Sequence, residues 1–205
     1  MRSVPEMRTL GLSLFSVLAL ALICGGTASA QNVGDNSVYF TTYYSNANTP
    51  GAQDQTVRLI NDGDTGASLW ASFYVFDDNE ELQECCSCEV TPDGLTSESV
   101  NHNLTANSLT RKLNARGLIK VISSCVAAGG PTNYTNKPTP GLRLWSTHTE
   151  RASPTAGAFY VTESPAADSN LGSSEKTLVE ELCFYLNLLG GTQGPCSCTP
   201  KDTDF

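Results

Sequence analysis

The chain has few basic residues, two histidines and no apolar run long enough to cross a membrane. Its 205 residues include 12 lysines and arginines against 21 aspartates and glutamates, which gives a formal net charge of −9. A surface of that sign repels phosphate groups, so we expect no nucleic-acid partner. The longest apolar run covers residues 10–23, whereas a helix needs about 20 apolar residues to cross a bilayer core. We therefore expect no transmembrane span.

Residues 1–30 are typical of a cleavable signal peptide. Arg2 and Arg8 precede the apolar run, and the small residues 28–30 follow it. We expect cleavage after residue 30, with residues 31–205 secreted to the extracellular space or the periplasm. That remaining length is typical of a single domain.

An odd number of cysteines remains once Cys24 leaves with the leader. The remaining seven are Cys85, Cys86, Cys88, Cys125, Cys183, Cys196 and Cys198. Disulfides persist in exported proteins, so we expect three bonds and one cysteine that is free or joined to another chain. We predict that the three early cysteines pair with Cys183, Cys196 and Cys198, which leaves Cys125 as the odd one. Cys125 could then form a disulfide-linked dimer.

The order of the early cysteines limits how these bonds can form. In an extended chain Cys86 and Cys88 point to one side and Cys85 points to the other, so the three should reach different partners. Their individual connectivity stays open. A bond from this cluster to the C-terminal region closes a loop of roughly a hundred residues, which stabilises a fold by about 4 to 5 kcal/mol if it is unstrained.

Metal binding is the alternative use of these residues. Cys85, Cys86, Cys88, Cys196 and Cys198 could supply soft thiolates for copper(I) or zinc. Their C-x-C spacing differs from the C-x₂-C of structural zinc sites, and export favours disulfides. Asp62 and Asp64 begin a turn that resembles a calcium loop, but Gly66 and Phe73 stand where oxygen ligands are needed. We expect no metal and no cofactor.

Short apolar or β-branched runs separated by Gly and Pro predict strands along most of the chain. These runs are residues 37–44, 56–61, 68–76, 95–100, 118–123, 141–147 and 158–163. The run 68–76 carries bulky groups on both faces, which is typical of a central strand covered on both sides. The acidic turn at 62–66 suggests that 56–61 and 68–76 form a hairpin. The run 95–100 is predicted to be an edge strand.

Residues 174–189 predict one amphipathic helix. Its apolar positions recur at steps of three and four residues: Leu178, Val179, Leu182, Cys183, Leu186 and Leu189. Ser173 or Ser174 can cap its start, and Gly190 can end it. The sequence therefore predicts a mostly β fold, an antiparallel β-sandwich of about six to eight strands with one C-terminal helix. Disulfides would tie this single domain, residues 31–205, to its cysteine-containing tail.

No complete catalytic motif is present, so we expect a protein that is not an enzyme. Ser173 and Lys176 fit S-x-x-K, but the companion motifs of penicillin-binding enzymes are missing. His148 and Glu150 fit the H-x-E of zinc deaminases, whose cysteine signature is one residue short here. The second histidine is His102. Aromatic residues could line a sugar- or partner-binding face, although most should be core: Tyr39, Tyr43, Tyr44, Trp70, Tyr74 and Trp145.

The cysteine clusters carry a resemblance to a known group of proteins. At Cys85–Cys88, with Val57–Asn61 and Tyr74–Asp77 upstream and Cys196–Cys198 near the end, the chain resembles a family of uncharacterised secreted bacterial proteins with a CCSC…CSC pattern. The resemblance implies export from a bacterium and no particular activity. We expect a secreted structural or binding module of the envelope or extracellular space, with a protein or glycan partner. The alternative is a thiolate metal-binding protein.

Overall fold

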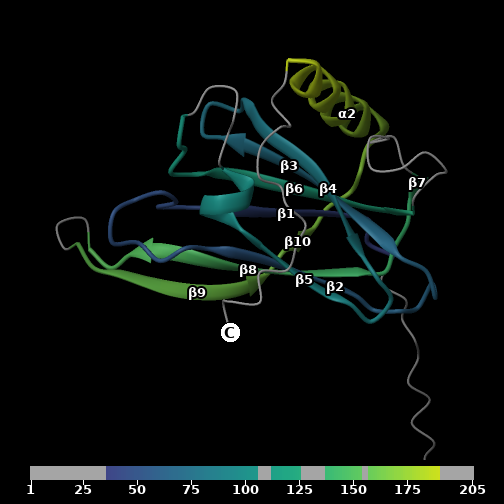
Figure 1. Cartoon of the computed structure of the whole chain (residues 1–205), viewed down its shortest axis with the longest axis horizontal. Coiled ribbons are helices and arrows are strands. Elements are labelled where there is room, and N and C mark those ends of the chain that lie inside the picture. The colour runs from purple at the N-terminus through teal and green to yellow at the C-terminus, as the bar shows by residue number, and fades with distance from the viewer. Residues whose placement is uncertain (1–35, 106–111, 126–136, 154–156, 190–205) are drawn as a thin grey trace, which may run out of the picture. The chain divides into compact units, whose positions relative to one another are not determined.

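A computed structural model describes residues 36–105, 112–125, 137–153 and 157–189. The chain divides into two units, Met1–Gly34 and Asp35–Phe205, and all described residues belong to the second. They form two stacked antiparallel sheets with one helix outside the first sheet (Figure 1). The predicted β-sandwich with a C-terminal helix is confirmed. No helix within the described ranges is long and apolar enough to cross a membrane.

Sheet A contains six strands in the order β10-β1-β6-β3-β4, with β7 paired to β6. Their bounds are β1 (Tyr39–Tyr44), β3 (Leu69–Asp77), β4 (Leu82–Val90), β6 (Gly117–Cys125), β7 (Lys137–Pro138) and β10 (Ala167–Asp168). Strand β3 lies between β6 and β4 and is buried on both faces, as predicted for a central strand. Strand β4, which contains the early cysteines, forms an edge of this sheet.

Sheet B contains four strands in the order β5-β2-β8-β9. Their bounds are β2 (Thr56–Asn61), β5 (Leu95–Ser99), β8 (Leu142–Arg151) and β9 (Phe159–Pro165). Strand β5 lies at one edge, as predicted, and a short π-helical turn, η1 (Val100–Leu104), follows it. Strand β9 forms the other edge.

The predicted hairpin between residues 56–61 and 68–76 is wrong, because β2 belongs to sheet B and β3 to sheet A. Both strands place apolar side chains in the core between the sheets, so they face each other across that core instead of pairing. The connection turns over one end of the sandwich. There the Asn61 side chain donates hydrogen bonds to the carbonyl oxygens of Ala67 at 3.0 Å and Val90 at 2.9 Å.

The helix α2 (Ser173–Leu188) packs on the outer face of sheet A. It buries Val179, Cys183 and Leu186 against Tyr39, Tyr74, Phe76, Cys85 and Ile122. Its bounds differ by one residue from the predicted 174–189. Gly172 is the N-cap and makes no side-chain capping bond, so the predicted capping by Ser173 or Ser174 is wrong: both serines already lie within the first helical turn. Gly190 lies outside the described residues.

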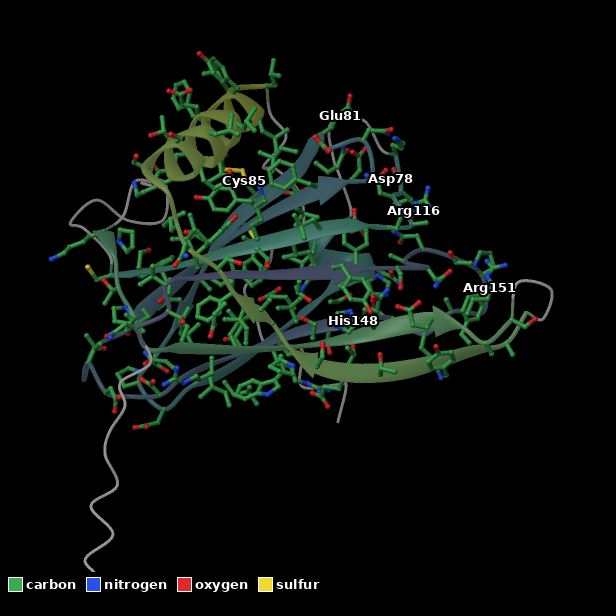
Figure 2. The ribbon with its side chains drawn as sticks, turned by 180° about the vertical axis from the view of Figure 1, so that it is seen from behind. Asp78, Glu81, Cys85, Arg116, His148 and Arg151 are labelled. Carbon is green, nitrogen blue, oxygen red and sulfur yellow. A yellow bond between two sulfur atoms is a disulfide. The ribbon has the colours of Figure 1, made fainter. Side chains whose placement is uncertain are left out.

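A disulfide between Cys85 and Cys183 joins β4 to α2 (Figure 2). The predicted orientation of the three early cysteines is confirmed. Cys85 packs with the helix, while Cys86 and Cys88 point into the core between the sheets. Cys86 and Cys88 are disulfide-bonded as well, and Cys125 has no disulfide. Their pairing with Cys196 and Cys198 stays a prediction, since those two cysteines lie outside the described residues.

Two glutamates are buried in the sandwich. Glu84 on β4 is 1% exposed, and neither of its carboxyl oxygens has a hydrogen-bond partner among the described residues. Burial raises the pKa of Glu84 to about 7. Burial likewise raises the pKa of Glu98 to about 7, against the lowering effect of the Asn103 amide, which donates to Glu98 Oε2 at 2.7 Å. The fold therefore favours the protonated form of both carboxyl groups.

We predict that replacing Cys85 and Cys183 together by alanine lowers the free energy of unfolding by about 2 to 5 kcal/mol. The bond closes a loop between residues 98 positions apart, and its loss frees the unfolded chain. Denaturant unfolding followed by circular dichroism measures the change. Cys125→Ser is the control and should shift the free energy by less than about 0.5 kcal/mol. An unchanged double variant contradicts this assignment.

The free energy of unfolding should fall as the pH rises from about 4.5 to about 7, and Glu84→Gln should remove part of that fall. The folded protein keeps the Glu84 proton up to the raised pKa, whereas the unfolded chain releases it near 4.5. The stabilising contribution is therefore complete below pH 4.5 and lost as the pH rises through 7, by about 3 kcal/mol. Denaturation midpoints at a series of pH values test this. Glu89→Gln, an exposed position on the same strand, should leave the pH dependence unchanged.

Candidate functional site

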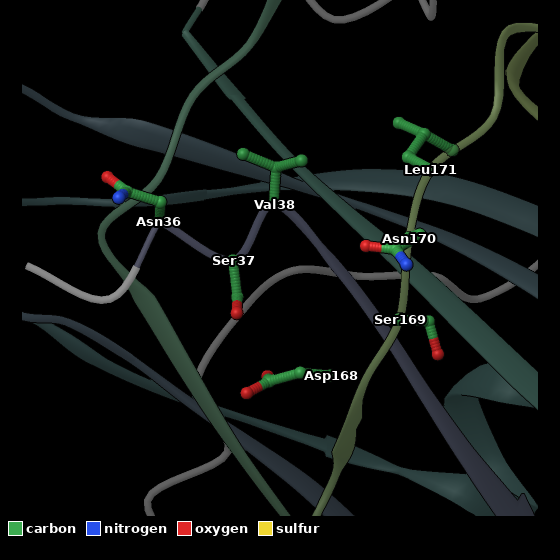
Figure 3. Close-up of a pocket in the computed structure, with 7 residues that line it drawn as sticks. All are labelled: Asn36, Ser37, Val38, Asp168, Ser169, Asn170 and Leu171. Atoms are coloured by element: carbon green, nitrogen blue, oxygen red, sulfur yellow. The ribbon is translucent and has the colours of Figure 1, made fainter.

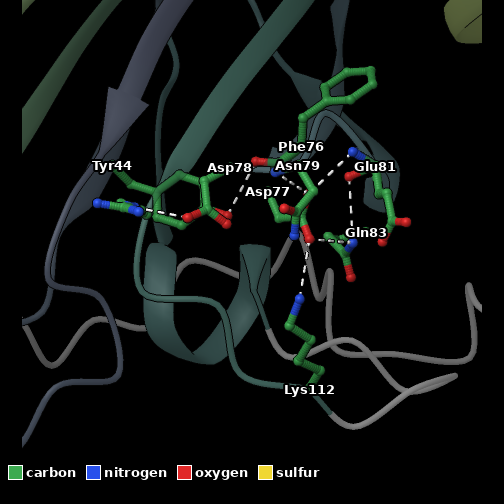
Figure 4. Close-up of polar contacts among 9 residues, drawn as sticks. Tyr44, Phe76, Asp77, Asp78, Asn79, Glu81, Gln83 and Lys112 are labelled. Atoms are coloured by element: carbon green, nitrogen blue, oxygen red, sulfur yellow. Dashed lines mark hydrogen bonds and ion pairs between the residues drawn. The ribbon is translucent and has the colours of Figure 1, made fainter.

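The acidic turn between β3 and β4 is structural (Figure 4). Asp77 Oδ1 accepts the backbone N–H groups of Asn79 and Glu81 at 2.9 and 3.0 Å, and Oδ2 contacts Gln83 and Lys112. Burial by itself would raise the pKa of Asp77, but the backbone hydrogen bonds and Lys112 together lower it. The carboxylate is thus fully used in shaping the turn.

The residues predicted as metal candidates do not form a metal site in the described part of the chain. Asp62 pairs with Arg143 at 3.1 Å and accepts the backbone N–H of Asp64 at 3.2 Å. No group of three or more His, Cys, Asp or Glu side chains within the described ranges could hold an ion. Cys85, Cys86 and Cys88 are in disulfides, so they offer no thiolate in this form.

Two surface hollows contain little that points to chemistry. The first, of about 400 Å³, lies beside the start of β1 (Figure 3). It is lined by Asn36, Ser37, Val38, Asp168, Ser169, Asn170 and Leu171. The second, of about 360 Å³, contains His102 and Arg58, and Arg58 already pairs with Glu163 at 2.9 Å. Thr147 lines this second hollow, so His148, the next residue of β8, points to the opposite face. The two histidines therefore do not share a site.

His148 fixes the place where β1 approaches the middle of β8 (Figure 2). Its side chain is 2% exposed, its Nδ1 lies 3.1 Å from the carbonyl oxygen of Tyr43, and its Nε2 lies 2.9 Å from Ser164 Oγ. A carbonyl oxygen only accepts, so Nδ1 carries the proton and Nε2 accepts the Ser164 hydroxyl. Burial lowers the pKa of His148, which keeps the ring neutral and locked in this tautomer.

Tyr43 is held in place from two directions. Its ring stacks on the imidazole of His148, with centroids 4.1 Å apart and planes inclined by 10°. Its hydroxyl donates to Glu150 Oε1 at 3.1 Å, and Ser45 Oγ lies at the same distance from that oxygen. Partial burial and then this hydrogen bond raise the pKa of Tyr43, so the phenol remains a donor at neutral pH. Even so, 48% of Tyr43 is exposed.

A second half-exposed tyrosine, Tyr160, lies beside the glutamate that accepts the Tyr43 hydroxyl. Tyr160 on β9 pairs directly with Glu150 on β8, so both side chains are on the same face of sheet B. Tyr160 is 49% exposed, and its electrostatic interaction with Tyr43 is the smallest of the effects that raise the pKa of that phenol. We call Tyr43, Glu150 and Tyr160 the tyrosine platform. It combines two half-exposed aromatic rings, from β1 and β9, with one carboxylate from β8.

Only part of the tyrosine platform follows from the sequence. Tyr43 was one of the six aromatic candidates, of which Tyr39, Tyr44 and Tyr74 are buried core residues. Glu150 belonged to the H-x-E match, but its partner here is a tyrosine and not a zinc-bound water. Tyr160 and Ser164 were missed. The only signal for them is strand alternation, which needs the β8–β9 register before it places Tyr160 beside Glu150.

Comparisons with known proteins give little further information. No protein-family model and no curated protein matches the chain. A solved structure, described as that of Thermotoga maritima 1070, aligns with 67% of this chain and 97% of its own length, at 10% identity and a TM-score of 0.40. That likeness is too weak to support an argument about function.

We predict that the His148 imidazole titrates below 6.5, its ordinary pKa. Because the folded state favours the neutral ring, the stabilisation is complete above pH 6.5 and lost as the pH falls through the folded-state pKa. The ring-proton shift in NMR spectra recorded from pH 8 downward, with about half-unit steps, measures the midpoint. A His148→Phe variant identifies the signal by its loss. A midpoint at or above 6.5 would show that the ring is not buried as described.

Proposed function

We propose that the chain is a disulfide-stabilised binding module that acts outside the cytoplasm and binds a neutral glycan at the tyrosine platform. The observation that carries this proposal is the state of Tyr43, which is half exposed yet held by both His148 and Glu150. A ring fixed in advance loses little conformational freedom when a ligand stacks on it, so more of the contact energy appears as affinity.

The chemistry of the platform suits a sugar. The apolar C–H faces of a pyranose ring pack on aromatic rings, and its hydroxyl groups need acceptors such as a carboxylate. Tyr43 and Tyr160 supply the rings, and Glu150 supplies the acceptor. A neutral glycan fits better than an anionic one, because the chain has a net charge of −9 and a carboxylate lies within the platform.

The proposed location outside the cytoplasm rests on the disulfides and the N-terminal sequence. Cys85, Cys86, Cys88 and Cys183 are all disulfide-bonded, and such bonds persist in oxidising compartments. The leader-like residues 1–30 fit export to the same compartments. A thiolate metal carrier remains the alternative prediction from the sequence, and no feature of the described residues favours it.

The expected result is that one or more neutral oligosaccharides bind, and that Tyr43→Ala and Tyr160→Ala each weaken binding by about tenfold, as loss of a stacked ring costs about 1.4 kcal/mol. Isothermal titration against soluble gluco-, xylo-, manno- and galacto-oligosaccharides measures the affinity. Tyr185→Ala is the matched control, since Tyr185 is an exposed tyrosine on α2, outside the platform. If the unmodified protein binds none of these sugars, or if the control loses affinity equally, the proposal is wrong.

A further inference from the structure

Strand β9 leaves one side of sheet B open. It is last in the order β5-β2-β8-β9, and no described segment pairs with its second side (Figure 1). Unpaired N–H and C=O groups on a strand edge are a template for another strand. The other long edge strand, β4, differs because six of its nine residues are buried and α2 packs against its outer face.

The hydrogen bonds at the two ends of β9 show which backbone groups point outward. Ala152 N donates to Ala158 O at 2.9 Å, and Ala166 N donates to Leu144 O at 3.0 Å. Bonded pairs alternate in an antiparallel ladder, so the pairs between these ends that bond β8 involve residues 160, 162 and 164 of β9. The N–H and C=O groups of Phe159, Val161 and Glu163 therefore point away from β8.

A second copy of the same strand can match this pattern in an antiparallel arrangement. If two β9 strands pair antiparallel about a two-fold axis at Val161, then Val161 meets Val161 and Phe159 meets Glu163 of the second copy. Every outward N–H of one copy then faces an outward C=O of the other. Axes at Tyr160 or Thr162 would also bring outward groups together, but they would not set Glu163 opposite Phe159, and an axis at Glu163 would set two carboxylates opposite each other.

The side chains also fit this register. Val161 is 43% exposed and would be covered by its own symmetry copy. The guanidinium of Arg151 lies 5.4 Å from the centre of the Phe159 ring. Glu163 of the second copy, which pairs at the surface with Arg58 of its own chain at 2.9 Å, would lie opposite Phe159 and so on the same face as this second positive charge. By symmetry this attraction occurs at both ends. No two like charges face each other across the pairing, although the chain as a whole is acidic.

We propose that β9 is a self-association edge, through which two copies of this chain pair antiparallel at Val161 and continue sheet B from one copy into the other. The charge match between Arg151 and Glu163 at each end is the reason for choosing a second copy as the occupant. A foreign extended peptide would satisfy the same backbone groups without requiring that match.

Analytical ultracentrifugation of the mature chain, over a wide concentration range, tests this proposal. We expect a reversible dimer that Val161→Pro converts to a monomer. The Val161 N–H points away from β8, so proline there removes an outward donor and keeps the β8–β9 ladder, and the melting temperature of the monomer should be nearly unchanged. Thr162→Pro is the matched control: it removes a donor to β8 and should lower the melting temperature.

A charge exchange keeps the test independent of folding defects. Val161→Lys and Val161→Glu should each be monomeric, because like charges would meet at the axis, and their equimolar mixture should form a heterodimer. The same measurements in a Cys125→Ser background separate this dimer from a covalent one. The proposal is overturned if the unmodified chain stays monomeric, if Val161→Pro still dimerises, or if Cys125→Ser abolishes the dimer. Glycan titration of the Val161→Pro monomer reports on the tyrosine platform separately.

Discussion

The disulfide between Cys85 and Cys183 joins the helix to the sandwich and so fixes which face of sheet A is covered. It holds α2 against the outer face of sheet A, next to the nine-residue edge strand β4. An edge of that length can pair with other strands, but six of the nine residues of β4 are buried, which limits access to it. Among the described strands, β9 is by contrast a long edge strand whose residues are mostly exposed, and it carries Tyr160 of the tyrosine platform.

Local pattern predicted the orientation of each of these two cysteines, although not that they pair with each other. In a strand, neighbouring side chains point to opposite faces, so Cys85 had to leave the core that Cys86 and Cys88 enter. The three- and four-residue spacing around Cys183 placed that cysteine on the buried stripe of a helix. Both patterns depend on chain geometry within a few residues, so they can be recognised without knowledge of the tertiary structure.

Relations between distant segments were not predictable in the same way. An acidic, glycine-containing turn after Asn61 is typical of a hairpin. The strand that follows nevertheless belongs to the other sheet, and both strands bury apolar side chains in the core between the sheets. The tyrosine platform combines Tyr43 of β1, Glu150 of β8 and Tyr160 of β9. Its existence depends on strand order and on a register between β8 and β9 that no local pattern encodes. The carboxyl of Glu84, which has no hydrogen-bond partner among the described residues, likewise cannot be predicted from sequence, where an acidic residue indicates a solvated position.

The two proposals meet on β9 and reinforce each other. The backbone groups of Phe159, Val161 and Glu163 serve the pairing between copies, while the side chain of Tyr160 belongs to the platform. A two-fold axis normal to the continued sheet keeps equivalent faces of both copies on one side, so both platforms would face the same surface. Two sites on one rigid sheet bind a repeating polymer with greater avidity than either site alone. A glycan chain is such a polymer, and self-association through β9 would therefore convert a weak single site into an effective bivalent one.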